Sequence, residues 1–282
     1  MKTPDVVTTV PALRALVAKW RQEGSGVGLV PTMGALHDGH LSLVAQARRH
    51  ALKIIVSVFV NPAQFAPHED FDRYPRDLER DLARLAEQDL TELVFAPAIS
   101  ELYPEGFATR LEMAGPALGL EADFRPHFFS GVSTIVAKLL IAANPHAAVF
   151  GEKDYQQLLV IRRLVRDLGL AVDILGAPIL READGLALSS RNAYLDARQR
   201  QIAGRLNRVL TETATNVRAG ISIAEAETRG RNALRAAGFD SIDYVALRNA
   251  TTLAKIETTV PQMRVLAAAT IGAVRLIDNV PV

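Results

Sequence analysis

The feature that most constrains the fold is the alternation of short apolar runs with helical patterns along the first two thirds of the chain. Ile54–Val60 is β-branched and apolar almost throughout, as in a parallel strand that is covered on both faces. Leu78, Leu82 and Leu85 then follow at a helical spacing between charged neighbours. Because strands that alternate with helices build parallel sheets, this order predicts a doubly wound, Rossmann-like α/β domain.

The same alternation continues on both sides of these two segments. We expect further strands at residues 27–31, 93–95, 147–150 and 172–175. We expect further helices around Leu13–Trp20, from near Gly39, and at residues 131–143 and 155–168.

The pattern changes after about residue 180. Asp196 is placed to cap a long helix that reaches about Ala219, and a second helix is expected over residues 224–237. Three short apolar runs follow and indicate a small antiparallel sheet, at residues 242–247, 264–271 and 274–277. We therefore predict a Rossmann-like domain over residues 1–179 and a smaller α+β domain over residues 180–282, without a low-complexity linker.

Composition excludes several classes of protein. Of 282 residues, 49% are hydrophobic and 22% are charged, which is enough apolar material for a sizeable core. The net charge of +1 argues against a protein that coats nucleic acid. The absence of cysteine excludes disulfides, thiolate zinc sites and thiol nucleophiles. With no signal-peptide pattern and no apolar run of membrane-spanning length, we expect a soluble cytoplasmic protein without nucleic-acid or membrane partners.

The first chemical motif is Pro31–His40, which follows a predicted strand. His37 and His40 lie at the start of a helix, where both rings can point at a phosphate beside free backbone N–H groups. Gly39 leaves room for phosphate oxygens near the backbone. Two other interpretations stay open: a capped helix with surface histidines, and a zinc site, which needs a third ligand.

Three more segments carry polar groups where the chain leaves a strand or passes the predicted boundary. They are residues 59–65, with Gln64; residues 150–158, with Lys153 and Gln157; and residues 188–192, with Arg191. The last combines hydroxyls with a guanidinium, a combination suited to phosphate. Each segment also fits an ordinary polar turn or loop.

Taken together and in this order, the four segments resemble the pantothenate synthetase family. The first contains the His-x-Gly-His signature of the nucleotidyltransferase superfamily. The resemblance implies an AMP-forming ligase that joins pantoate to β-alanine with ATP through a pantoyl-adenylate intermediate. It further implies Mg²⁺ as a cofactor and a homodimeric state.

The resemblance also implies roles for individual residues. The implied catalytic residues are His37, His40, Lys153, Ser189, Ser190 and Arg191. The implied ATP-binding residues are Met33, Gly34, Ala35, Leu36, His37, Asp38, Gly39, His40, Gly151, Glu152, Lys153, Asp154, Leu180, Leu188, Ser189, Ser190 and Arg191. Lys153 would contact phosphate and Asp154 the ribose, while residues 189–191 would form a lid on the triphosphate.

For the acid and amine substrates, the resemblance implies Gln64, Gln157 and Arg125 as ligands. An amide can orient a carboxylate nucleophile without quenching its charge. Arg125 also fits an ordinary turn before proline. Asp81 would lie near Mg²⁺ by resemblance only, and the alternative is a solvated position on the polar side of its helix.

Two rival functions remain at this level. Another nucleotidyltransferase would share His37 and His40 but would not need the pair Gln64 and Gln157. A nucleotide-binding protein without turnover would have little use for the full set of cationic and imidazole groups.

Overall fold

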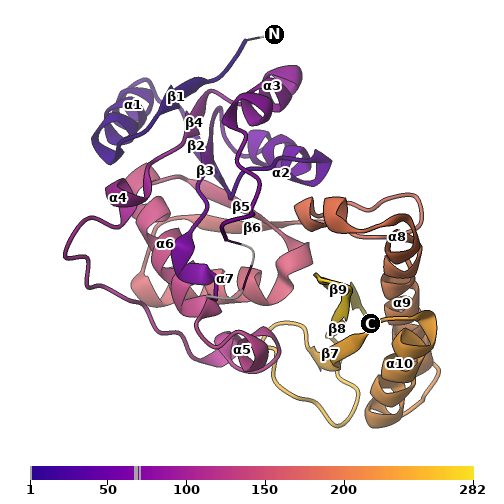
Figure 1. Ribbon diagram of the computed structural model, residues 1–282. Helices are drawn as coiled ribbons and strands as arrows, with labels where there is room; N and C mark the ends of the chain where they lie inside the picture. The colour runs from indigo at the N-terminus through magenta and orange to yellow at the C-terminus, as the bar shows by residue number, and fades with distance from the viewer. Residues whose placement is uncertain (1, 67–68, 70) are drawn as a thin grey trace. The chain divides into compact units, whose positions relative to one another are not determined.

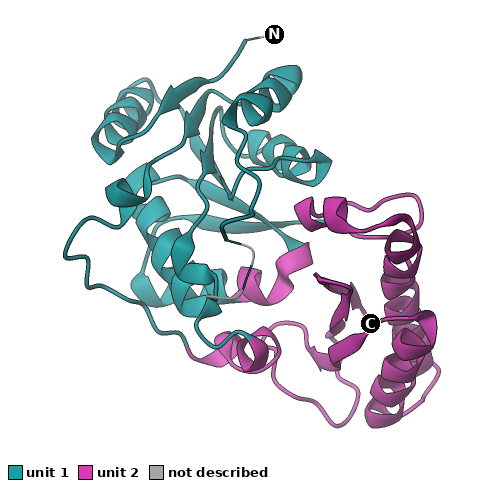
Figure 2. Ribbon diagram, viewed as in Figure 1, with its two compact units in different colours: residues 1–113, 125–152, 160–178 teal, residues 114–124, 153–159, 179–282 magenta. Residues whose placement is uncertain are grey.

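The computed structural model describes residues 2–66, 69 and 71–282 (Figure 1). The chain divides into two compact units, coloured teal and magenta in Figure 2. Unit 1 comprises Met1–Met113, Arg125–Glu152 and Val160–Pro178, and unit 2 comprises Ala114–Phe124, Lys153–Leu159 and Ile179–Val282. The expected domain boundary at residues 179/180 stays a prediction.

Within its described residues, unit 1 contains a six-stranded parallel sheet with the strand order β1-β4-β3-β2-β5-β6. The strands are β1 (Asp5–Val7), β2 (Val27–Thr32), β3 (Lys53–Val58), β4 (Leu93–Phe95), β5 (Ala147–Gly151) and β6 (Asp173–Ala177). The prediction of a doubly wound parallel sheet is confirmed.

Helices cover both faces of this sheet, which is why its central strands β2 and β3 are largely apolar and buried. Val30, Val56 and Val94 pack in one cluster with residues of α2 (Asp38–Arg48) and α3 (Leu78–Gln88). Leu29 and Ile55 alternate with these valines and are also buried, on the opposite face. The other helices that begin in or run through unit 1 are α1 (Val10–Gln22), α4 (Ile99–Leu102), α6 (Phe128–Ala143) and α7 (Tyr155–Leu168).

The strand order reverses direction at β2. From β2 the chain proceeds to β3 and β4 on one side, and β5 and β6 lie on the other side. In open α/β sheets, ligands bind beyond the carboxyl ends of the strands at such a switch point. The chain leaves β2 after Thr32 and β5 after Gly151, so the segments that begin at residues 33 and 152 start at this edge.

Unit 2 pairs helices with an antiparallel sheet of strand order β7-β8-β9. Its elements include α5 (Glu121–Phe124), α8 (Ala197–Ala203), α9 (Arg205–Arg218), α10 (Ile223–Ala237), β7 (Ser241–Asn249), β8 (Met263–Ile271) and β9 (Val274–Pro281). Leu206, Leu210 and Leu234 of the helices pack with Val265 and Ala267 of the sheet in one apolar core. The predicted smaller α+β part is confirmed.

A buried ionic cluster attaches α5 to the sheet of unit 2. Arg275 donates to both carboxylate oxygens of Glu121, at 2.7 and 2.8 Å, and the Tyr244 hydroxyl donates to Glu121 at 2.6 Å. Burial raises the pKa of Tyr244 well above its ordinary value, so this hydroxyl keeps its proton.

Several details differ from the sequence-based expectation, among them the short helices α4 and α5, which were not predicted. The predicted long helix is two helices, α8 and α9, on either side of Gly204, a residue with low helix propensity. Asp196 does cap α8, accepting the Gln199 N–H at 2.8 Å. Helix α6 begins at Phe128 rather than residue 131, and β1 was not predicted. None of the helices in the described ranges has the length and apolar character needed to cross a membrane.

Candidate active site

The segment after β2 makes a tight turn that the Thr32 side chain ties to the neighbouring strand β3. Thr32 Oγ1 donates to the Ser57 carbonyl at 2.7 Å and accepts the Gly34 N–H at 3.1 Å. Gly34 and Ala35 both have positive φ, +80° and +51°. A Cβ at Gly34 would lie 3.0 Å from Asp81 Oδ2, so glycine meets both the conformational and the spatial requirement.

Asp81 of α3 holds this turn in place. Its two carboxylate oxygens accept the Ala35 N–H at 3.0 Å and the Leu36 N–H at 2.7 Å. Its side chain is buried, with 2% of the residue exposed, so the expected solvated position was wrong. Burial raises the pKa of Asp81, although the two N–H donors oppose that shift. The sequence signal was its spacing, because residue 81 falls on the same helical face as Leu78 and Leu85.

The two motif histidines are fixed through the same ring atom. His37 Nδ1 caps α2 by accepting the Gly39 N–H at 3.1 Å, and His40 Nδ1 accepts the His37 N–H at 3.3 Å. Their ring centroids are 4.1 Å apart. A nitrogen that accepts a hydrogen bond carries no proton, so we assign the ring proton of each histidine to Nε2. The cap interpretation is correct as geometry.

Gln64 is brought to the same turn from the end of β3. It closes a 3-10 helix, Pro62–Gln64, and its Nε2 donates to Met33 Sδ at 3.0 Å. Its Oε1 accepts the Asn61 amide N–H at 3.1 Å. Asn61 is 1% exposed, and sequence reasoning treated it only as part of a turn signal. The motif glutamine is therefore paired with a buried amide, that of Asn61.

Arg125 contacts the backbone beside Gln64. Its NH2 donates to the Gln64 carbonyl at 3.0 Å, and its Nε and NH2 donate to the two carboxylate oxygens of Glu69, each at 2.7 Å. Its guanidinium also stacks on the Phe128 ring at 3.9 Å. A bidentate pair of this kind fixes the orientation of the Arg125 guanidinium. The arrangement gives Arg125 a role in holding the Gln64 segment.

Helix α6 approaches the same segment closely enough to exclude a side chain. A Cβ at Gly131 would lie 2.2 Å from the Ala63 carbonyl oxygen and 2.8 Å from the Gln64 nitrogen. The Gly131 carbonyl in turn accepts the Asn61 amide N–H at 3.2 Å. The 3-10 turn therefore lies directly on the backbone of α6.

In unit 2, the residues at the start of α7 are tied to the sheet and to α5. The Lys153 carbonyl accepts the Asn279 amide N–H at 3.0 Å, and Asn279 is 2% exposed. Gln156 is buried and bonds to Pro116, Gly119 and Glu121. Gln157, the implied substrate ligand, is half-buried. The two adjacent glutamines therefore differ in environment.

The implied lid residues follow a short hairpin in unit 2. The Leu188 N–H donates to the Leu180 carbonyl at 3.0 Å, which brings these two implied ATP-binding residues together. Arg181 within the hairpin forms a bidentate pair with Asp278 at 2.7 and 2.9 Å. Ser189 Oγ caps the 3-10 helix Ser190–Tyr194 by accepting the Arg191 N–H at 3.3 Å. The hairpin that precedes the lid residues is therefore held in place by hydrogen bonds and an ion pair.

The implied site residues fall into two groups, one in each unit. Unit 1 holds residues 33–40, 151 and 152 with Gln64, Asp81 and Arg125, and unit 2 holds Lys153, Asp154, Gln157, Leu180 and residues 188–191. Within unit 1, hydrogen bonds link the turn after β2 to Asp81 and Gln64, and Gln64 to Arg125.

The described residues do not bring three or more His, Cys, Asp or Glu side chains together in a metal-binding group. A zinc site at His37 and His40 therefore has no third ligand among them.

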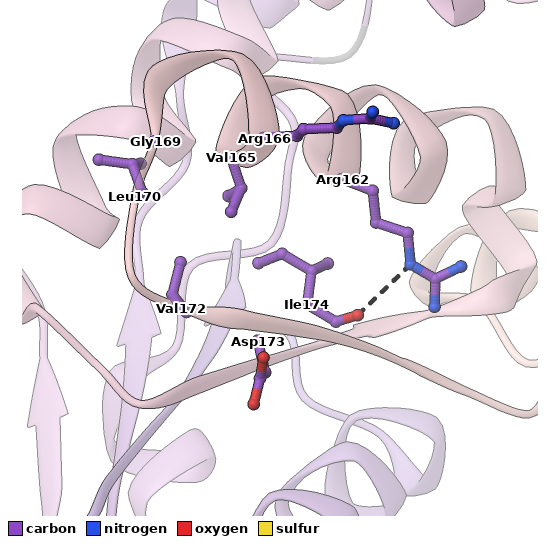
Figure 3. A pocket seen from close by; sticks show the side chains of 8 residues that line it. All are labelled: Arg162, Val165, Arg166, Gly169, Leu170, Val172, Asp173 and Ile174. Atoms are coloured by element: carbon purple, nitrogen blue, oxygen red, sulfur yellow. Dashed lines mark hydrogen bonds between the residues drawn. The ribbon is translucent and has the colours of Figure 1, made fainter.

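A pocket of about 490 Å³ lies elsewhere in unit 1, between the end of α7 and the start of β6 (Figure 3). Arg162, Arg166 and Asp173 line it, and Arg162 Nε donates to the Ile174 carbonyl at 3.3 Å. The pocket is at the amino end of its strand, whereas the candidate residues follow the carboxyl ends of β2 and β3. It is separate from the candidate active site.

Comparisons with known proteins identify the family and agree with the fold. The model of the pantoate-β-alanine ligase family matches residues 5–281. A pantothenate synthetase of Mesorhizobium japonicum is 55% identical over 100% of this chain and 99% of its own length. The crystal structure of a pantothenate synthetase from Thermus thermophilus superimposes with a TM-score of 0.91 at 50% identity, over 98% of each chain. The Francisella tularensis pantoate-β-alanine ligase, complexed with β-γ ATP and β-alanine, is 33% identical over 99% of this chain and 97% of its own, with a TM-score of 0.83.

Proposed function

The chain belongs to the pantoate-β-alanine ligase family, and on that premise we propose how its residues join pantoate to β-alanine with ATP. The observation that carries the proposal is the 3.0 Å between Gln64 Nε2 and Met33 Sδ. It places an amide suited to an organic acid beside the turn that leads to both histidines.

In the first step, a carboxylate oxygen of pantoate attacks the α-phosphorus of ATP, and pyrophosphate leaves. Negative charge grows on the phosphate oxygens. His37 and His40 both lie at the N-terminus of α2, where the helix dipole also favours an anion. One well-aimed donor of this kind contributes about 3 to 4 kcal/mol to the transition state. We assign phosphate stabilisation to these two rings.

Asp81 shapes the surface that the phosphates meet. By accepting the Ala35 and Leu36 N–H groups, it fixes the turn from which α2 starts. Both of its oxygens are engaged, and the residue is 2% exposed, so it fits poorly as a direct magnesium ligand. We therefore give Asp81 an anchoring role and derive no step through magnesium, whose presence on the triphosphate stays a prediction.

In the second step, the amine of β-alanine attacks the carbonyl carbon of pantoyl adenylate, and AMP leaves as pantothenate forms. We assign Lys153, Ser189, Ser190 and Arg191 of unit 2 to the phosphates and Gln157 to pantoate. The support is their match to the family motifs and their anchored backbones. The homodimeric state and the cytoplasmic location stay predictions.

The test is pyrophosphate release from ATP with magnesium, with and without pantoate and β-alanine. A ligase should release pyrophosphate only when pantoate is present. Without β-alanine, release should stop near one equivalent per enzyme, because the adenylate stays bound; with β-alanine, AMP and pantothenate should form in equal amounts. Release that is independent of pantoate would indicate another nucleotidyltransferase, and no release would indicate nucleotide binding without turnover.

A further inference from the structure

Tyr103 lies far from every motif in the sequence, yet it contacts the amide pair of the candidate site. It follows α4, and its hydroxyl donates to Asn61 Oδ1 at 2.7 Å. Asn61 bonds directly to Gln64. A chain of hydrogen bonds thus runs from Tyr103 through Asn61 to the proposed pantoate ligand.

The direction of every bond in this chain is determined by backbone groups that cannot change roles. Asn61 Oδ1 accepts the Ala63 N–H at 3.3 Å, and Asn61 Nδ2 donates to the Gly131 carbonyl at 3.2 Å. A backbone N–H can only donate and a carbonyl can only accept, so the amide of Asn61 has one satisfied orientation. The Tyr103 hydroxyl must then donate to Asn61, because Oδ1 has no hydrogen.

The orientation of Asn61 sets that of Gln64. Since Asn61 Nδ2 donates, it selects the oxygen of Gln64 and directs Gln64 Nε2 toward Met33, whose sulfur is a weak acceptor. Gln64 thus presents an N–H donor for which an oxygen of a ligand is a better partner than sulfur. An acid or a hydroxyl compound satisfies this donor, and a ligand that presents only N–H groups does not.

The far end of the chain is held rigidly. The Tyr103 ring packs edge-on against Phe107 at 5.1 Å, and Lys138 Nζ lies 4.4 Å from the Phe107 ring centroid. Burial raises the pKa of Tyr103 to about 12, so its hydroxyl stays protonated at neutral pH. Gly131 adds to the rigidity by keeping α6 against the turn that carries Gln64.

We propose that Tyr103 is a positioning residue that acts through Asn61 to keep the N–H face of Gln64 directed at the acid substrate. The inference rests on the proposed role of Gln64 as a pantoate ligand. Without the hydroxyl, Asn61 Oδ1 keeps only the longer bond from the Ala63 N–H at 3.3 Å, so the Asn61 amide is held less tightly and Gln64 can turn its oxygen toward the substrate oxygens and repel them.

The decisive variant is Tyr103→Phe, which keeps the ring and its packing. We expect the pantoate KM to rise about three- to tenfold while the ATP KM stays unchanged, as for the loss of one neutral hydrogen bond. Tyr244→Phe is the matched control, because it removes a buried hydroxyl that bonds to Glu121 and has no link to Gln64. It should lower thermal stability without a selective effect on the pantoate KM. Equal changes in both KM values of Tyr103→Phe would overturn the proposal.

A double-mutant cycle with Gln64→Ala separates this inference from the proposed function. If Tyr103 acts through Gln64, Tyr103→Phe should have no further effect on the pantoate KM once Gln64 is alanine. Effects that multiply would refute the linkage. If Gln64→Ala alone leaves the pantoate KM unchanged, the assignment of Gln64 itself fails; if only Tyr103→Phe is without effect, the positioning role alone fails.

Discussion

The carboxylate of Asp81 accepts the Leu36 N–H at 2.7 Å, and this bond joins helix α3 to the turn that precedes the two motif histidines. The Ala35 N–H binds the other carboxylate oxygen. An isosteric amide in place of the carboxylate can accept only one of the two N–H groups. The substitution Asp81→Asn therefore removes one hydrogen bond to the turn without changing the size of the side chain.

We predict that Asp81→Asn leaves the fold intact and lowers kcat/KM for ATP about tenfold. The reason is that one buried N–H loses its acceptor, at a cost of about 1 to 3 kcal/mol. Pyrophosphate-release kinetics measure the effect, and Glu79→Gln, an exposed residue of the same helix, is the control. Wild-type kinetics in Asp81→Asn would show that the turn holds its shape without the carboxylate.

The raised pKa of Asp81 predicts opposite pH dependences for activity and stability. Activity needs the carboxylate, so it should rise with pH through the raised pKa. A raised pKa means that the folded state binds the proton more tightly than the unfolded state, so the stability contribution of Asp81 should be lost as pH rises through the same range. Urea unfolding of wild type and Asp81→Asn between about pH 4 and 7 tests the sign. A wild-type advantage that grows with pH would contradict it.

His40→Ala should lower adenylation about a hundredfold or more, because one phosphate donor is lost. Folding should survive, since the His37 side chain still caps α2 by accepting the Gly39 N–H, while the bond from the His37 N–H to His40 is lost. Single-turnover pyrophosphate release and circular dichroism measure the two properties. His50→Ala, which changes an exposed histidine just beyond the same helix, should behave like wild type. Unimpaired turnover of His40→Ala would remove this ring from the site.

The adjacent glutamines of α7 should respond differently to truncation. Gln157→Ala should raise the pantoate KM about tenfold and leave the ATP KM nearly unchanged, as expected for a substrate amide. Gln156→Ala removes three bonds to residues 116–121 and should instead lower the melting temperature. Steady-state kinetics of both variants measure the KM values, and thermal unfolding of both measures the melting temperatures. A selective loss of ATP affinity in Gln157→Ala would refute its assignment.

The lid residues should also protect the reactive intermediate. Pantoyl adenylate is a mixed anhydride, so water must be kept from it until β-alanine arrives. Ser190→Ala combined with Arg191→Ala should slow adenylation and raise the ratio of AMP to pantothenate above one. The wild type and Arg198→Ala, an exposed arginine of α8, should stay near one. A slow variant with an unchanged ratio would limit the segment to phosphate binding.

The sheet could be predicted because strands covered on both faces must be apolar throughout, and that leaves a visible run in the sequence. β1 could not, since it has three residues that remain partly exposed. The break between α8 and α9 occurs at a single glycine, Gly204. One glycine does not interrupt the helical spacing of the apolar residues, so the pattern predicted one continuous helix.

Within the candidate site, the motifs identified the residues that would meet a ligand. The anchoring roles of the residues that hold them were not visible in the same way. Asp81, Asn61 and Tyr103 act through contacts between separate elements, and those contacts depend on where side chains meet in the fold. Arg125 was selected as a substrate ligand, and its partners could be identified only from the structure.

The close approach of α6 to the Ala63 carbonyl has a consequence for mutational scanning. Because any Cβ at position 131 would overlap that carbonyl, every substitution there has to push the turn that carries Asn61 and Gln64. Position 131 should therefore be as intolerant in an activity screen as a residue that touches substrate, even though glycine offers no side chain to the reaction. A screen that measures protein abundance alongside activity would distinguish a substitution that displaces the turn and the packing of α6 from one that removes a contact with substrate.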